Sequence, residues 1–173
     1  MMTNGEIKYS PEVFENLINS QKSKLYKTGM AILKNDDDTC DAIQETLISA
    51  YKNFNSLANI EYFGTWITRI LINKCYDIIR KNKKVSYINE EVESNVNTAY
   101  YDIYKSESIV ERVLNMIDSD LRLVATLYYY DEYSVKEISE LLNIPEGTVK
   151  SRLSRARDKM YDILKKEEGD SIG

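Results

Sequence analysis

Residues 133–157 read YSVKEISELLNIPEGTVKSRLSRAR, and this segment contains two helical patterns separated by a short break. The first pattern begins at Ser134, which stands three residues before Glu137. This is the spacing of a capping box, in which the side chain of each residue bonds the backbone N–H of the other. The break comes just before Pro145, because the residue before a proline avoids the helical region. The segment therefore predicts a helix over 135–142 and a second helix that follows the proline.

The second helix, which starts near Glu146, is basic on the face that its apolar residues leave outward. Those apolar residues are Val149, Leu153, Ala156, Met160 and Ile163. Two short helices joined by a tight break, the second one basic, form the pattern of a helix-turn-helix. In that motif the second helix lies in the DNA major groove and its N-terminal part meets base edges. The alternative is a solvated basic helix in an ordinary bundle, but the capping box and the break favour DNA binding.

The outward face of this second helix supplies the candidate DNA contacts. They are Thr148, Lys150, Ser151, Arg152, Ser154, Arg155 and Arg157. Arginine can bond two acceptors of guanine at once, and serine can bond bases or phosphates. Lysine and the flanking arginines suit phosphate oxygens, which fix the register on DNA without reading its sequence.

Helical periodicity extends over most of the rest of the chain, so we expect an all-α protein. Glycine and proline are scarce, at 6 and 2 of the 173 residues. Residues 86–106 lack the periodicity and are rich in Glu, Asn and Ser, which is typical of a flexible acidic linker. We therefore predict two small helical domains, over 8–85 and 107–167, joined by that linker.

The charge of the chain is unevenly distributed. The net charge is −5, which taken alone argues against nucleic-acid binding. Basic residues nevertheless gather in 69–84 and in 150–159, and each of these stretches holds a single acid. Acidic residues gather in 36–45 and 90–93 instead. This distribution suits a protein with two kinds of partner.

Several features point away from catalysis, metal binding and membranes. The chain has no histidine, the commonest general base and a common zinc ligand. It also lacks a glycine-rich phosphate loop and a paired-carboxylate motif, so we expect no enzyme, no metal and no cofactor. We expect both cysteines, Cys40 and Cys75, to be buried reduced thiols. Without a signal peptide or a long apolar run, we expect a cytoplasmic protein that does not insert into the membrane.

Two helical segments of the N-terminal half carry further candidate sites. We expect Asp36–Asp38 to cap the first of them. Its expected inner stripe is Cys40, Ile43, Leu47, Ala50, Tyr51 and Phe54. Its outer face carries acidic, amide and apolar side chains, for which the pattern alone favours plain solvent exposure over docking. The second segment places Trp66 in an apolar stripe, so we expect that ring in the core rather than stacked on a base.

Three segments resemble the extracytoplasmic-function (ECF) sigma factors of the sigma-70 family. Residues 133–157 resemble region 4.2, most specifically at the sequences GTVKSRL and RAR. Residues 41–48, DAIQETLI, resemble the region 2.2 signature, and residues 63–73, FGTWITRILIN, resemble regions 2.3 and 2.4. Some two-component regulators share the GTVK signature, so the C-terminal segment alone leaves a stand-alone helix-turn-helix regulator open. Such a regulator would need a dimer interface and a palindromic site.

The resemblance implies a role for each candidate site. The last helix would read the minus-35 promoter element as duplex DNA. The outer face of the helix around residues 41–48 would bind core RNA polymerase, and the implied contacts are Asp41, Gln44, Glu45 and Ile48. The loop and helix that follow would hold the melted minus-10 strand, and the implied contacts are Asn55, Ser56, Asn59, Asn73, Lys74, Arg80 and Lys84. The chain departs from the family at Leu71, where alanine is common, and in its asparagine-rich loop.

The resemblance also implies partners and a setting. An alternative sigma factor binds core RNA polymerase and promoter DNA, directs transcription from particular promoters, and is not itself an enzyme. The family pattern adds an anti-sigma factor, usually membrane-anchored, which can hold the sigma factor at the inner face of the membrane. An envelope-stress signal then releases it.

Overall fold

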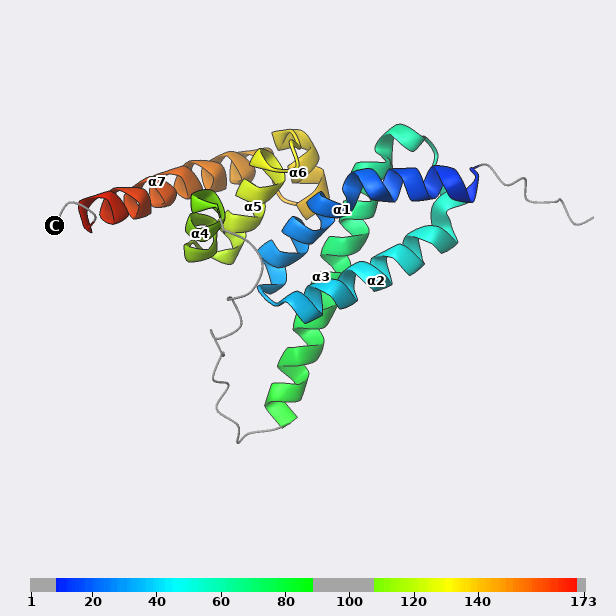
Figure 1. Ribbon diagram of the computed structural model, residues 1–173, viewed down its shortest axis with the longest axis horizontal. Coiled ribbons are helices and arrows are strands. Elements are labelled where there is room, and N and C mark those ends of the chain that lie inside the picture. Colours follow the sequence, from blue (N-terminus) through cyan, green and yellow to red (C-terminus); the bar gives the residue numbers. More distant parts are fainter. Residues whose placement is uncertain (1–8, 89–107, 171–173) are drawn as a thin grey trace, which may run out of the picture.

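The computed structural model describes residues 9–88 and 108–170, and every regular element in those ranges is helical. The elements are α1 (Pro11–Leu33), α2 (Asp36–Asn53), η1 (Phe54–Ser56), η2 (Ile60–Tyr62), α3 (Phe63–Ile88), α4 (Ile109–Met116), α5 (Ser119–Tyr129), α6 (Val135–Leu142) and α7 (Glu146–Asp170) (Figure 1). The prediction of an all-α protein is therefore confirmed. The predicted linker, 86–106, lies outside the described residues apart from its first three, which continue α3.

The first two helices begin at side-chain caps. Ser10 accepts a hydrogen bond from the backbone N–H of Val13, and a proline follows it at the first helical position. At α2 the capping residue is Asn35, whose Oδ1 accepts from the N–H of Asp38 at 2.8 Å. The expectation that Asp36–Asp38 cap this helix is wrong. These aspartates form the first turn instead, where their negative charge complements the helix dipole.

Helices α1, α2 and α3 pack around one apolar core. Its fully buried members include Leu25, Phe63 and Ile67. Phe63 meets Phe54 edge-on, with ring centroids 5.8 Å apart, and a tilted contact of the same length joins it to Trp66. Trp66 therefore packs against the core, as its place in the apolar stripe predicts.

The expected inner stripe of this segment is confirmed in part, because Ala50 and Phe54 are buried and Ile43 and Leu47 pack against the core. Its other two members, Cys40 and Tyr51, are exposed. The structure buries Thr39, Ala42 and Thr46 as well. The expectation that Cys40 is a buried thiol is therefore wrong, while Cys75 is buried as predicted. The reason is that each threonine hydroxyl donates to the carbonyl four residues earlier, so a polar side chain can be buried at little cost.

Helices α4 to α7 form the second helical unit. Both α4 and α6 begin with a complete capping box, Ser108 with Glu111 and Ser134 with Glu137. Asn143 ends α6 in the left-handed conformation, with φ of 52°, and this residue makes the break before α7. The predicted capping box, break and helix-turn-helix geometry are confirmed.

Ser134→Ala tests the capping box of α6. The variant should lose about 1 kcal/mol of unfolding free energy, because the backbone N–H of Glu137 loses the Ser134 hydroxyl that accepts its hydrogen bond. The measurement is the urea midpoint of unfolding of the full chain. Ser119→Ala is the matched control, because Ser119 is an exposed serine at the start of α5 and makes no side-chain cap. Equal midpoints for the two variants would contradict the prediction.

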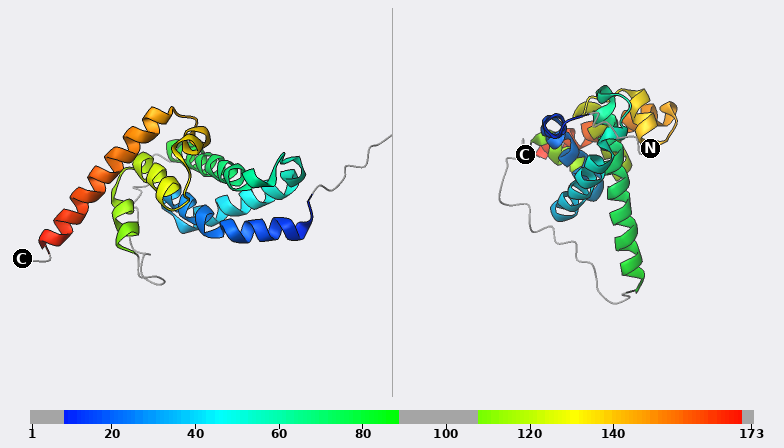
Figure 2. Two further views of the ribbon diagram at one scale, coloured as in Figure 1. Left: turned by 90° about the horizontal axis from the view of Figure 1, so that it is seen from above. Right: turned by 90° about the vertical axis from the view of Figure 1, so that its right-hand side faces the viewer.

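The two helical units pack directly against each other. Ile72 of α3 belongs to the same apolar cluster as Leu123 and Leu127 of α5, and Ile32 of α1 packs against that cluster. Helix α1 lies along α5, and α3 lies beside α6 (Figure 2). None of the helices in the described ranges is long and apolar enough to cross a membrane.

Candidate nucleic-acid and polymerase interfaces

The first part of α7 presents a polar, basic face to solvent. Val149, Leu153 and Ala156 are buried, and this fixes the rotation of the helix. Lys150, Ser151, Ser154 and Arg155 therefore point outward and are exposed. Lys150 and Arg155 form no side-chain hydrogen bond or ion pair within the described part of the chain, so both cations are available to a ligand.

Two of the other predicted residues of α7, Arg152 and Arg157, contact side chains of α5. Arg152 is half-buried and forms an ion pair with Asp120, with 2.9 Å between nitrogen and oxygen. Arg157 donates to the hydroxyl of Tyr129 at 3.5 Å. Thr148 is also half-buried, and its backbone carbonyl accepts from the Ser151 hydroxyl. Arg152 and Arg157 are thus oriented by side chains of α5 and flank the exposed face.

The outer face of α2 is exposed at each of the four predicted polymerase contacts. They are Asp41, Gln44, Glu45 and Ile48. Ile48 is 52% exposed, an apolar side chain in an otherwise polar face. Glu45 lies 3.6 Å from the ammonium nitrogen of Lys74 on α3. This ion pair places the candidate polymerase face directly beside the candidate minus-10 face.

The loop before α3 is held by its own asparagines and serine. The Asn55 Oδ1 accepts from the Tyr9 N–H at 3.2 Å, and the Ser56 hydroxyl donates to the Asn53 carbonyl. Asn59 accepts from the N–H of Glu61 and donates to its carboxylate, each at 3.0 Å. These side chains shape the loop, so a ligand would meet the rim that they support.

Tyr62, in this same loop, is a candidate that the sequence analysis missed. Its side chain is 64% exposed, although it stands next to the buried Phe63. An exposed aromatic ring beside a basic helix can stack on an unpaired base. The available signal was an aromatic residue directly before the helix and out of phase with its apolar stripe.

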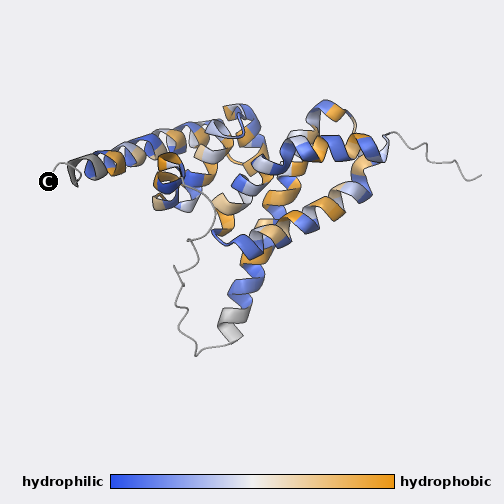
Figure 3. Cartoon of the chain, viewed as in Figure 1, coloured by the Kyte–Doolittle hydropathy of each residue, from blue (hydrophilic) through white to orange (hydrophobic). Residues whose placement is uncertain are grey.

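The far half of α3 extends beyond the bundle and is strongly polar (Figure 3). Asn73, Arg80 and Lys84 are exposed along it. Arg80 forms an ion pair with Asp77 one turn earlier, and this hydrogen bond lowers the pKa of the Asp77 carboxyl. The helix therefore presents a row of donors and cations that could follow a nucleic-acid backbone.

Side chains that could hold a metal ion do not gather anywhere in the two described ranges, where no group of three or more His, Cys, Asp or Glu is present. The candidate contacts instead lie on exposed surfaces of α2, α3 and α7.

Comparisons with known proteins agree with this arrangement. Residues 17–85 match the family model of sigma-70 region 2, and residues 108–160 match that of sigma-70, region 4. The ECF RNA polymerase sigma factor SigW of Bacillus subtilis is 33% identical over 169 residues, which cover 89% of this chain and 90% of SigW. The RNA polymerase sigma factor SigV of the same organism is 28% identical over 151 residues, covering 87% of this chain and 90% of SigV.

Two solved structures share the fold. The sigma factor RpoE, crystallised with the anti-sigma factor NepR from Bartonella quintana, superposes with a TM-score of 0.73 at 24% identity, covering 89% of this chain and 98% of RpoE. CnrH, in complex with the cytosolic domain of CnrY, gives a TM-score of 0.63 at 20% identity over 90% of each chain.

The fold and the matched regions define a sigma factor of the sigma-70 family. Within that family the chain belongs to the ECF sigma factors. It is an alternative sigma factor, a class that directs transcription initiation.

Proposed function

We propose that this chain binds core RNA polymerase through the outer face of α2, reads the minus-35 element with α7, and holds the melted minus-10 strand on α3 and its preceding loop. The observation that carries the proposal is the orientation of α7. Buried Val149 and Leu153 fix the helix so that Arg155 and Lys150 project freely into solvent. This is the geometry that a recognition helix needs to enter a major groove.

The minus-10 role rests on the loop and the basic half of α3. A single strand needs a positively charged track and a surface on which bases can stack. Arg80 and Lys84 supply exposed charge, Asn73 supplies hydrogen-bonding groups, and Tyr62 supplies the exposed ring. The loop residues Asn55, Ser56 and Asn59 support the rim on which an extruded base would rest.

The polymerase role of α2 makes a charge-reversal prediction. Glu45→Arg should weaken binding to core polymerase at least about tenfold, because it places a cation in an acidic face that meets a complementary partner. The fold should persist, because Glu45 is exposed. Glu15→Arg, the same exchange at an exposed position of α1, is the matched control. Titration of labelled core polymerase with each variant measures the two affinities, and equal affinities would rule out this docking face.

The proposal includes an anti-sigma partner. RpoE and CnrH, which share the fold, were each solved with a protein partner, and NepR is an anti-sigma factor. We expect this chain to act in the cytoplasm, without catalysis of its own and without a cofactor. Its anti-sigma factor would be membrane-anchored and would release it in an envelope-stress response.

The decisive experiment is in vitro transcription on a genomic promoter library, with core polymerase alone and with core polymerase plus this chain. The expected result is a set of new start sites that share minus-35 and minus-10 elements at a fixed spacing. If no new start sites appear and the chain alone shifts a specific duplex, the proposal fails in favour of a stand-alone helix-turn-helix regulator.

A further inference from the structure

Two carboxylates at the start of α5 pair with cations of α7. Asp120, in the first turn of α5, forms an ion pair with Arg152, with 2.9 Å between oxygen and nitrogen. Asp118, the residue before this helix, forms a second ion pair with Lys159, and the hydrogen bond in that pair lowers the pKa of the Asp118 carboxyl. Negative charge from α5 therefore meets the basic helix at two points.

Arg152 and Lys159 lie on the same side of α7 and form its Arg152 flank. They are seven residues apart, or about two helical turns, so their side chains leave the helix in nearly the same direction. Lys150 and Arg157 are also seven residues apart and form the Lys150 flank. This second flank lies on the opposite side, because Lys150 precedes Arg152 by two residues and each residue turns the helix by about 100°. The outward face of α7 lies between the two flanks.

The two flanks differ in the groups that they meet. Both cations of the Arg152 flank pair with carboxylates of α5. On the other flank, Lys150 forms no ion pair or side-chain hydrogen bond within the described residues, and Arg157 donates to the hydroxyl of Tyr129 rather than to a carboxylate of α5. The Arg152 flank is therefore neutralised by α5, whereas the Lys150 flank is not.

The packing of α5 against α7 keeps the two aspartates in place. Ala125 of α5 and Ala156 of α7 are both fully buried, in one cluster with Leu121. Small side chains at such a contact let two helices approach closely. The start of α5 therefore cannot leave α7 without opening this core.

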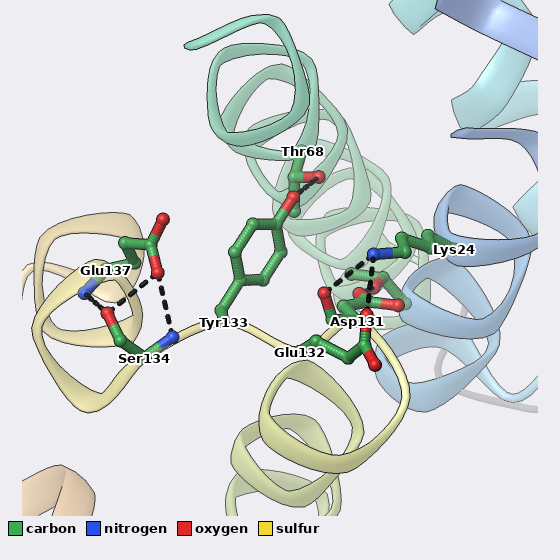
Figure 4. A network of polar contacts seen from close by, with 8 residues as sticks. Lys24, Thr68, Asp131, Glu132, Tyr133, Ser134 and Glu137 are labelled. Carbon is green, nitrogen blue, oxygen red and sulfur yellow. Dashed lines mark hydrogen bonds and ion pairs between the residues drawn. The ribbon is translucent and has the colours of Figure 1, made fainter. Parts of the chain in front are cut away.

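Both ion pairs join helices of the same helical unit. Polar contacts with the first unit lie at the other end of α5, where Tyr133 reaches the hydroxyl of Thr68 and Lys24 pairs with Glu132 (Figure 4). The neutralised flank is therefore a property of the second unit itself.

The neutralisation limits what α7 offers to DNA phosphates. Residues 150–159 carry five cations and one acid, and the two aspartates of α5 lower the net charge of this region from +4 to +2. An exposed ion pair is weak, so Arg152 could exchange Asp120 for a phosphate. That exchange would leave the Asp120 side chain, which is 63% exposed, beside the negatively charged phosphates. The repulsion offsets the new contact, so the Arg152 flank gains little from DNA.

We propose that Asp118 and Asp120 neutralise one flank of the recognition helix and so keep the sequence-independent attraction of α7 to DNA weak; this inference rests on the DNA-binding role proposed for α7. Phosphates are bound by the Lys150 flank, while the Arg152 flank contributes little. Because phosphate contacts supply most of non-specific binding, base contacts such as that of Arg155 carry a larger share of the affinity. The chain is thereby held less tightly at the many competing sites of a genome.

The test measures binding of the full-length chain to a fluorescent duplex of arbitrary sequence, by anisotropy, between about 50 and about 200 mM KCl. Asp120→Asn and Asp118→Asn each release one cation of the Arg152 flank. Each variant should bind the duplex about three- to tenfold more tightly than wild type at the lowest salt. The slope of log K against log salt concentration should become steeper by about 0.9 for each released cation. A misfolded variant would lose affinity, so a gain reports the released charge.

Glu15→Gln is the matched control, because it also removes one negative charge, from an exposed position near the start of α1 and far from α7 (Figure 1). It should leave the salt slope unchanged. If Asp120→Asn and Glu15→Gln give equal affinities and equal slopes, the neutralised flank is overturned, whether or not the wild-type chain binds the duplex.

Removal of the cations compares the two flanks directly. Arg152→Gln in the otherwise wild-type chain should change the affinity by less than about twofold, whereas Lys150→Gln should lower it about three- to tenfold and reduce the slope by about 0.9. Added to Asp120→Asn, Arg152→Gln should cancel the gain, because the released cation is then absent. Equal losses for Arg152→Gln and Lys150→Gln would show that both flanks bind phosphates, and would overturn the proposal.

Transcription with core polymerase separates this proposal from the function on which it rests. If the aspartate variants gain affinity but the chain opens no promoter with core polymerase, the neutralised flank stands and the proposed function fails. If the chain directs transcription but the aspartate variants bind DNA as Glu15→Gln does, the proposed function stands and the neutralised flank fails.

Discussion

Arg155→Ala is expected to lose about 10- to 100-fold in transcription from promoters that carry the preferred minus-35 element, or about 1–3 kcal/mol. Arg155 is exposed on the outward face of α7 and forms no ion pair or hydrogen bond in the described chain, so it is free to bond a guanine edge with both arms of its guanidinium. The loss should shrink at promoters whose minus-35 element is already mismatched at the base that Arg155 reads. A panel of single-base promoter variants, transcribed in vitro with the mutant holoenzyme, measures this dependence.

Lys166→Ala is the control for Arg155→Ala, because it removes one exposed charge from the distant part of the same helix. It should change transcription little at every promoter in the panel. A loss that is equal across all minus-35 sequences would make Arg155 a phosphate contact, which positions the helix without reading a base. No loss beyond that of Lys166→Ala would remove Arg155 from the DNA face.

The helix-turn-helix was predictable because every local signal in it agrees with the final structure. Ser134 and Glu137 cap α6, Asn143 terminates it, and Val149 and Leu153 orient α7. These are short-range effects, set by residues within one or two turns of each other. The exposure of Arg155 then follows from the buried stripe alone.

The register of α2 shows where apolar periodicity fails. An apolar pattern counts Cys40 as inward and Thr39 as outward, but the structure has them the other way round. Thr39 satisfies its hydroxyl on the Asn35 carbonyl and packs its methyl group against Gly29, where a Cβ would lie only 2.7 Å away. The burial of Thr39 therefore depends on the glycine of α1 that makes room for it, and this information lies in the partner helix rather than in α2.

The contact between the two units was equally beyond the reach of the pattern. Helical periodicity describes one helix at a time, so it does not show that Ile72 of α3 and Leu127 of α5 share an apolar cluster. The buried polar residues between the two units are even harder to recognise from the sequence. Asp131 stands in a turn and Thr28 in a basic stretch of α1, although the two side chains share a hydrogen bond. Because Asp131 and Thr28 both look solvent-exposed in the sequence, the sequence alone predicts two separate domains.

Leu71 gives the largest expected effect on stability, because its side chain fills the core formed by α1, α2 and α3. Its side chain is 0% exposed and belongs to the cluster of Ile67 and Cys75. Leu71→Ala should therefore lower the unfolding free energy by about 2–5 kcal/mol through lost burial and an unfilled cavity. Ile48→Ala, an aliphatic truncation at an exposed site, should cost no more than about 0.5 kcal/mol. Urea unfolding of both variants measures the difference, and equal values would mean that this core closes around the smaller side chain.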